Sequence, residues 1–134
     1  MSTIPSVLIV SSNPLHQDQA AVVVRLVGLH PVKCATLTDA RSLMEHERFE
    51  IVICGDDLPD CNLATAVRVI SATTGGAPVI VLSRLADWDA YLHALRAGAF
   101  DYIACPVETA ESERILRMAL AVKSAGQPPA RNAA

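Results

Sequence analysis

Residues 49–60 read FEIVICGDDLPD. Apolar, mostly β-branched side chains fill positions 51–54, which is typical of a strand buried on both faces of a parallel sheet. A Leu-Pro-Asp turn follows at 58–60, so the predicted strand, 50–54, ends beside Gly55. Because glycine has no side chain, the position directly after this buried run carries no reactive group.

Strand patterns and helix patterns alternate along the rest of the chain. Short apolar runs predict strands over 7–10, 32–36, 50–54, 77–82 and 102–105. Apolar residues at helical spacing predict helices over 14–29, from 38, from 63, over 86–97 and from 109. Alternation with short loops implies right-handed crossovers and a parallel sheet that is covered on both faces. The sequence therefore predicts an α/β fold.

Several helix ends carry residues that are typical of helix caps. Asn13 is a favourable N-cap and Pro14 suits the first helical position. Asp60 or Asn62 is expected to cap the helix after the 49–60 stretch, and Thr109 the last helix. Helical spacing predicts the apolar stripe of the first helix as Leu15, Val22, Val23, Leu26 and Val27.

Length and composition fit one globular domain. The chain has 134 residues, of which 51% are hydrophobic, 19% charged and only 4% aromatic, so aliphatic residues must form the core. A net charge of −3 without a basic run gives nucleic-acid binding no electrostatic support. We expect one domain over 1–123, and a disordered tail or linker remnant over 124–134, which is rich in Ala, Gly and Pro.

The sequence has no secretory or membrane signal. The N-terminus lacks a basic region, Pro5 interrupts it early, and no apolar run is long enough to span a bilayer. The histidines are scattered without the spacing of metal ligands. The cysteines form no CxxC pair, which is typical of free thiols in a cytoplasmic protein: Cys34, Cys54, Cys61 and Cys105. We therefore expect a cytoplasmic protein with no membrane contact.

Two stretches resemble the receiver domains of two-component response regulators. The LPD turn follows the third strand as it does in that family, and AGAFDYIACP at 97–106 is similar to the family's Ala-Gly-Ala-x-Asp-Tyr-Leu-x-Lys-Pro. The resemblance covers residues 7–122. It implies a flavodoxin-like, doubly wound sheet of five parallel strands in the order 2-1-3-4-5, with five helices. It also implies a cis peptide bond before Pro106 and a place in a bacterial phosphorelay.

The residues that carry phosphorylation in this family are replaced. The resemblance places Gly55 at the phospho-acceptor aspartate, four residues before the turn proline. It places Ser11 and Ser12 at the acidic pair that holds a divalent cation, and Cys105 at the lysine before the last proline. Two positions are retained: Ser83, at the hydroxyl position after strand 77–82, and Tyr102, at the aromatic position of the fifth strand. Because Mg²⁺ prefers anionic oxygen ligands, these residues predict a degenerate pocket without metal, cofactor or catalysis.

Two other uses of the pocket stay open. Asp56 or Asp57 is a candidate displaced acceptor, although a one-residue shift along a strand turns Asp56 to the other face. The alternative is that both carboxylates project into solvent. The second use is binding of an anion or small ligand where the acceptor is lost. Cys105 facing the pocket is either packed or a redox sensor, and a sensor needs nearby cations.

Aromatic residues mark a candidate partner surface. Leu92 and Leu95 are predicted to be core, whereas Tyr91 lies off their stripe, and both packed and exposed placements remain open for Trp88. The resemblance implies that Tyr102 couples phosphorylation to the surface in working receivers. Exposed aromatic clusters often mark interfaces.

The sequence thus predicts a pseudo-receiver that is not an enzyme and acts by protein–protein interaction. By resemblance, the interface comprises helix 86–97, strand 102–105 and the last helix. The partners implied are a second copy of the chain, a histidine kinase or an output protein.

Overall fold

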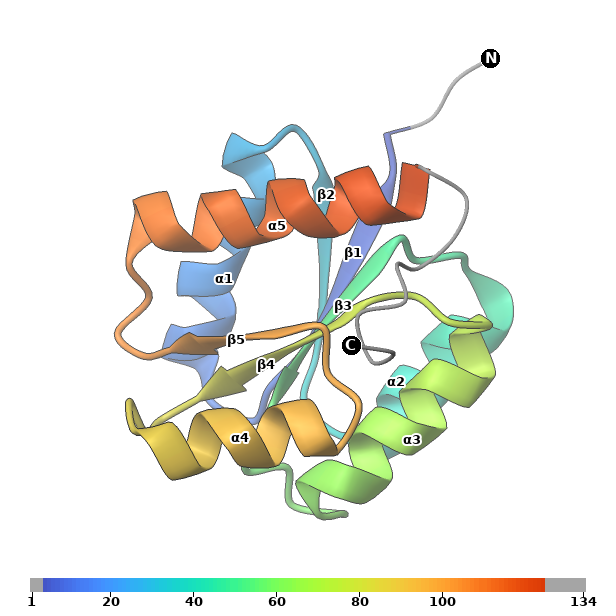
Figure 1. Ribbon diagram of the computed structural model, residues 1–134. Helices are drawn as coiled ribbons and strands as arrows, with labels where there is room; N and C mark the ends of the chain where they lie inside the picture. Colours follow the sequence, from blue (N-terminus) through green and yellow to red (C-terminus); the bar gives the residue numbers. More distant parts are fainter. Residues whose placement is uncertain (1–3, 125–134) are drawn as a thin grey trace.

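Five strands and five helices alternate along the chain in the computed structural model, which describes residues 4–124 (Figure 1). The strands are β1 Ser6–Val10, β2 His30–Cys34, β3 Ile51–Gly55, β4 Val79–Ser83 and β5 Asp101–Ala104. The helices are α1 Pro14–Leu26, α2 Leu37–His46, α3 Leu63–Thr74, α4 Trp88–Arg96 and α5 Thr109–Ser124. The tail expected over 124–134 lies outside the described residues, apart from Ser124 at the end of α5.

The strands are parallel and lie in the order β2-β1-β3-β4-β5, which confirms the flavodoxin-like order. The 49–60 stretch supplies the central strand, β3, between β1 and β4. Every residue of β3 and β4 is buried, as their continuous apolar runs predict. In the register of these two strands Cys54 is aligned with Val81 and Gly55 with Leu82.

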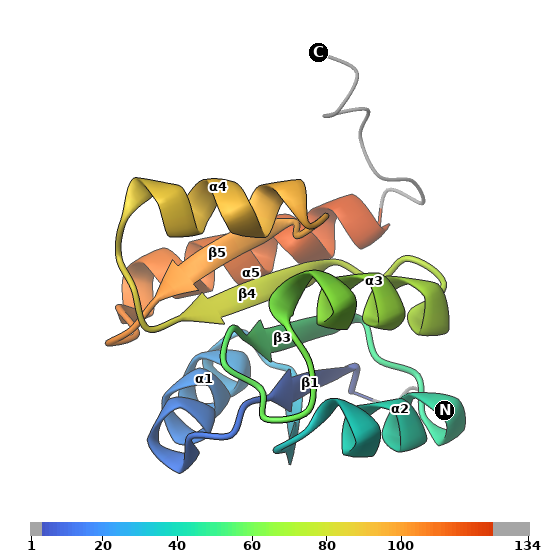
Figure 2. The same ribbon diagram turned by 90° about the horizontal axis from the view of Figure 1, so that it is seen from below.

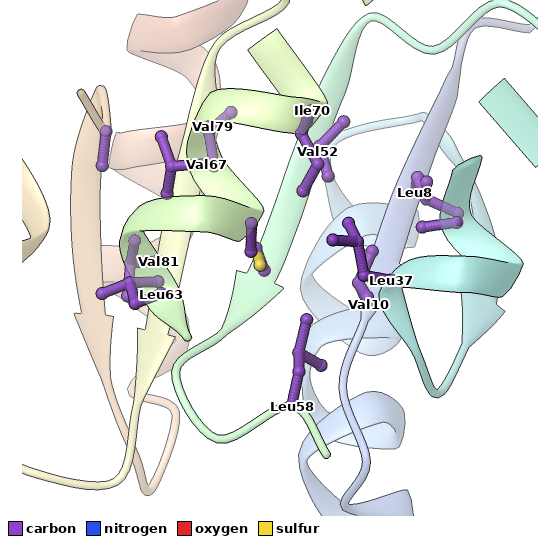
Figure 3. Close-up of a cluster of buried hydrophobic side chains, with 14 of the residues drawn as sticks. Leu8, Val10, Leu37, Val52, Leu58, Leu63, Val67, Ile70, Val79 and Val81 are labelled. Atoms are coloured by element: carbon purple, nitrogen blue, oxygen red, sulfur yellow. The ribbon is translucent and has the colours of Figure 1, made fainter. Parts of the chain in front are cut away.

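Helices cover both faces of the sheet. α1 and α5 lie on one face, and α2, α3 and α4 on the other (Figures 1 and 2). On the second face, Leu63 and Val67 of α3 share a buried cluster with Val52, Val79 and Val81 of the sheet (Figure 3). Each such buried aliphatic side chain contributes about 1.5–3 kcal/mol, so the fold needs few aromatics. No helix within residues 4–124 is both long and apolar enough to cross a membrane.

The buried face of α1 differs from the predicted stripe. Val23 is buried, but Leu15, Val22 and Leu26 are exposed. The other positions that face the sheet are taken by small or branched residues: Ala20, Ala21 and Val24. The buried face of α1 is thus made of small and branched side chains, and its leucines lie on the exposed side.

The structure decides between the two candidate caps of α3. Asn62 is the cap, because its Oδ1 accepts a 2.8 Å hydrogen bond from the Thr65 N–H. The Asp60 carboxylate instead accepts from the N–H groups of Leu37 and Thr38, at 3.1 and 3.0 Å. These hydrogen bonds lower the pKa of Asp60. They also tie the turn after β3 to the start of α2.

The corner between β5 and α5 agrees with one expectation and corrects another. The Cys105–Pro106 peptide bond is cis, as the resemblance implies. Thr109 is not the cap but the first helical residue. Oε1 of Glu108 accepts a 2.8 Å hydrogen bond from the Glu111 N–H and so takes the capping role.

Candidate functional site

The carboxyl ends of four strands place the predicted pocket residues at one edge of the sheet. Ser11 and Ser12 follow β1, Gly55 ends β3, Ser83 ends β4 and Cys105 follows β5. Because the strands are parallel, these positions lie at the same end of the sheet. The edge is joined across β4 and β5 by a 2.8 Å hydrogen bond from the Cys105 N–H to the Ser83 carbonyl.

Gly55 is buried beside the end of β1. A Cβ atom built on it would lie 3.4 Å from the carbonyl oxygen of Val10 and 3.6 Å from the Cα of Ser11. The same Cβ would lie 3.6 Å from Oδ1 of Asp57. These are ordinary contact distances and Gly55 has no positive φ, so the backbone would accept a side chain here. The glycine thus leaves the space at the end of β1 to the carboxylate of Asp57.

Asp56 is bound to Ser83, its neighbour across the two central strands. Oγ of Ser83 donates a 2.7 Å hydrogen bond to Oδ2 of Asp56. The strand register explains the contact. Gly55 of β3 is aligned with Leu82 of β4, so Asp56 and Ser83, which come next, lie side by side on the same face of the sheet. Successive side chains of a strand point to opposite faces, so Asp56 points away from the side on which a side chain at position 55 would project. Ser83 lies on the face to which Asp56 points.

The expectation that Asp56 and Asp57 project into solvent is wrong. Their side chains are only 16% and 30% exposed. Nε of Arg84 lies 3.9 Å from Oδ1 of Asp56 and 3.5 Å from Oδ2 of Asp57. Arg84 was not among the predicted site residues, although its place directly after Ser83 puts it at this edge of the sheet. The guanidinium is the nearby cation that partly neutralises two half-buried carboxylates.

The serines after β1 are engaged with the backbone. Ser11 is buried, and its Oγ accepts a 3.2 Å hydrogen bond from the Asn13 N–H. Ser12 is exposed, and its Oγ donates to the Asp57 carbonyl at 3.5 Å. As predicted, Asn13 caps α1, accepting from the Leu15 N–H at 2.9 Å. The N–H groups of Leu15 and His16 at the start of α1 thus already donate to the Asn13 side chain.

The donor set at this edge does not fit a magnesium ion. Ser11 and Ser12 present neutral hydroxyls, and the carboxylates of Asp56 and Asp57 share the charge of Arg84. Within residues 4–124, no three His, Cys, Asp or Glu side chains come close enough to hold a metal.

Cys105 lies in surroundings that favour the neutral thiol. Burial raises its pKa, and the carboxylates of Asp56 and Asp57 raise it further. Burial likewise raises the pKa of Cys34 and of Cys54 to about 12. The charged groups that act on Cys105 are therefore carboxylates, whereas a redox sensor needs nearby cations that lower the thiol pKa.

Three aromatic rings form a row from α4 to β5. The ring centroids of Trp88 and Tyr91 are 5.4 Å apart, and those of Tyr91 and Tyr102 are 5.9 Å apart in an edge-to-face arrangement. Trp88 is 68% exposed, which decides between its two predicted placements. Tyr91 is half-buried. The hydroxyl of Tyr102 is buried and hydrogen-bonds to no atom within residues 4–124.

The two leucines of α4 that are predicted to be core are only partly buried. Leu92 and Leu95 are half-buried, and Ala94 is the helix's fully buried residue. Trp88 and the neighbouring Leu85, which is 53% exposed, lie at the start of this helix. The start of α4 therefore presents an apolar surface close to the strand ends.

Comparison with known proteins identifies relatives of the whole fold. The family model described as the response regulator receiver domain matches residues 7–117. The response regulator protein PilR of Pseudomonas aeruginosa is 25% identical over 117 residues, 87% of this chain and 26% of PilR. The transcriptional regulatory protein ZraR of Salmonella typhimurium is 22% identical over 115 residues, 86% of this chain and 26% of ZraR. The chain thus spans about a quarter of the length of these curated relatives.

Solved structures share the same fold. A putative response regulator from Chloroflexus aurantiacus superposes with a TM-score of 0.82 at 24% identity, covering 89% of this chain and 99% of that chain. The receiver domain of a sensor histidine kinase from Pseudomonas aeruginosa superposes with a TM-score of 0.77 at 27% identity, with the same coverage. That receiver domain has a magnesium ion coordinated in its active site cleft.

The electrostatics of Cys105 generate a prediction. The double variant Asp56→Asn/Asp57→Asn removes the charges that raise the thiol pKa, so Cys105 should be alkylated faster by iodoacetamide at pH 8. The rate should rise because pH 8 lies below the pKa of this thiol, so a lower pKa increases the fraction of the reactive thiolate. The rate is measured by peptide mass spectrometry.

Cys34 is the internal control, since its pKa is raised by burial and by Asp39 rather than by the two substituted residues. An unchanged Cys105 rate, or an equal rise at Cys34, would contradict this electrostatic account.

Proposed function

Because the chain belongs to the response regulator receiver domain family of two-component signalling, we propose that it is a receiver that signals without phosphorylation. Gly55 carries the proposal. It ends the central strand where the family resemblance expects the acceptor aspartate, and it offers no oxygen to form an acyl phosphate. On this proposal the domain is not an enzyme and needs no cofactor.

The neighbours of Gly55 support the same conclusion. Phosphoryl transfer to a carboxylate requires cations that neutralise the phosphoryl oxygens. Ser11 and Ser12 stand where the resemblance expects the metal-binding acids, and the neutral thiol of Cys105 stands at the lysine. The guanidinium of Arg84 is already paired with two carboxylates. The metal, the acceptor and the lysine are therefore lost together.

The proposed output is binding of a protein partner through α4, β5 and α5. Trp88 and Leu85 are exposed at the start of α4, and Tyr91 and Tyr102 continue the aromatic row towards β5. Aromatic side chains are enriched among the residues that contribute most to protein interfaces. The partner is proposed to be a second copy of the chain or another two-component protein, such as a histidine kinase or an output protein.

A second candidate function is phosphorylation at a displaced acceptor. One observation favours Asp57: its Oδ1 lies 3.6 Å from where a Cβ of residue 55 would stand, so its carboxylate reaches towards the acceptor position. Asp56 is the other candidate, because its carboxylate binds Ser83. Binding of a free anion in the pocket is disfavoured, since both carboxylates would repel it.

Exposure to a small phosphodonor separates the first two functions. After incubation with acetyl phosphate and Mg²⁺, the wild-type chain should show no added phosphoryl group by intact-mass spectrometry, because residue 55 has no nucleophile. The variants Asp56→Asn and Asp57→Asn should give the same result. A stable phosphoryl group on the wild-type chain that one of these variants abolishes would establish that residue as the acceptor and refute the proposal.

Substitutions on α4 test the proposed interface. Trp88→Ala and Tyr91→Ala should each weaken self-association or partner binding by about 1 kcal/mol or more, as expected for aromatic anchors. Self-association is measured by sedimentation equilibrium. Circular dichroism should remain native for Trp88→Ala, since its side chain is largely exposed.

Leu15→Ala is the matched control, because Leu15 is 61% exposed on α1, across the sheet from α4. Leu15→Ala should leave association unchanged. If it weakens association while the two α4 variants do not, the interface includes α1 rather than α4.

A further inference from the structure

Two consecutive hydrogen bonds connect the end of β3 to the start of α4. Oγ of Ser83 donates to Oδ2 of Asp56 at 2.7 Å and accepts from the Leu85 N–H at 3.0 Å. Ser83 is 1% exposed, so its hydroxyl is shielded from competing water. One buried hydroxyl thus links the carboxylate that follows β3 to the loop that carries Leu85.

We propose that Asp56 is a built-in anionic ligand of Ser83, which holds the β4–α4 loop, residues 84–87, in one permanent conformation. We call this connection the Asp56 bridge: Asp56, Ser83 and the Leu85 amide. The inference rests on the proposed function, because a receiver that lacks a transferable phosphoryl group needs another source of order at its partner surface. The bridge provides it, since Leu85 lies on that loop two residues after Ser83, and Trp88 begins the helix that follows the loop.

The strength of the bridge comes from its charge. A hydrogen bond to a carboxylate is about twice as strong as one between neutral groups, and low local water content strengthens it further. A carboxylate of the chain itself cannot be released by hydrolysis. The bridge stabilises the loop conformation that it bonds, and it does not depend on a ligand that binds and leaves, so one conformation should prevail.

Asp56 bears this role rather than the neighbouring carboxylate. Asp57 is more exposed than Asp56, and its carboxylate pairs with Arg84 at 3.5 Å. Oδ1 of Asp56 is buried and accepts no hydrogen bond within residues 4–124, and Arg84 at 3.9 Å is its compensating charge. A half-buried carboxylate with one unsatisfied oxygen is costly to keep, which indicates that its orientation towards Ser83 has a use.

Hydrogen exchange at the Leu85 amide tests the bridge in the isolated chain. Exchange at Leu85 is followed by NMR and expressed as the ratio of the variant's rate to the wild-type rate, and exchange at Ile9 in the buried strand β1 is followed separately as the report of global stability. Asp56→Ala should raise this ratio by about tenfold, the loss expected for a hydrogen bond to a charged group. Asp56→Asn, which keeps an acceptor without charge, should raise it by only about threefold. Ser83→Ala should match Asp56→Ala.

Asp57→Ala is the matched control. It removes a carboxylate that follows β3 as Asp56 does and that also pairs with Arg84, but that makes no hydrogen bond to Ser83. Its ratio should stay within about twofold of wild type. Equal effects of Asp56→Ala and Asp57→Ala, or no effect of Asp56→Ala, would overturn the inference. The assay uses neither phosphodonor nor partner, so its failure is distinguishable from failure of the proposed function.

Discussion

Parallel pairing of β3 with β4 brings Asp56 beside Ser83, and the hydrogen bond between them organises this end of the sheet. The strand register is fixed by buried apolar side chains such as Ile53 and Ile80, because a one-residue slip would turn them to the opposite face of the sheet, where another buried cluster is already packed. The polar site therefore inherits its geometry from the aliphatic core. Arg84 then pairs with both of the carboxylates that follow β3, Asp56 and Asp57.

On the proposed function, the loss of the usual phosphorylation groups and the gain of new contacts are parts of one arrangement. Gly55 has no side chain where the family resemblance places the acceptor, and Asp57 reaches into the space beside it. Ser11 and Cys105 are neutral where the resemblance places charged groups that partner a metal or a phosphoryl group. Arg84 balances part of the negative charge that remains. Buried charge is thereby kept paired without a bound ligand.

The alternation of strands and helices could be predicted from the sequence because β1, β3 and β4 are apolar runs and the helix caps are local signals, whereas the strand order followed from the family resemblance. The cap at Asn13 and the central strand follow from neighbouring residues alone. The buried face of α1 was predicted less well, since helical spacing alone did not show that Ala20 and Ala21 are buried while Leu15 and Leu26 are exposed. The contact of Asp56 with Ser83 and the role of Arg84 depend on pairing across 27 residues, which periodicity does not reveal.

One measurement tests the central claim that this receiver is fixed in one state without phosphorylation. Beryllofluoride, a phosphoryl analogue, is added with Mg²⁺ while ¹H–¹⁵N spectra follow the amides of Ser83, Leu85 and Trp88. We predict that these resonances remain single and unshifted, because Gly55 cannot bind the analogue and no metal site supports it. Saturable shifts or a second set of peaks at these amides would contradict the account.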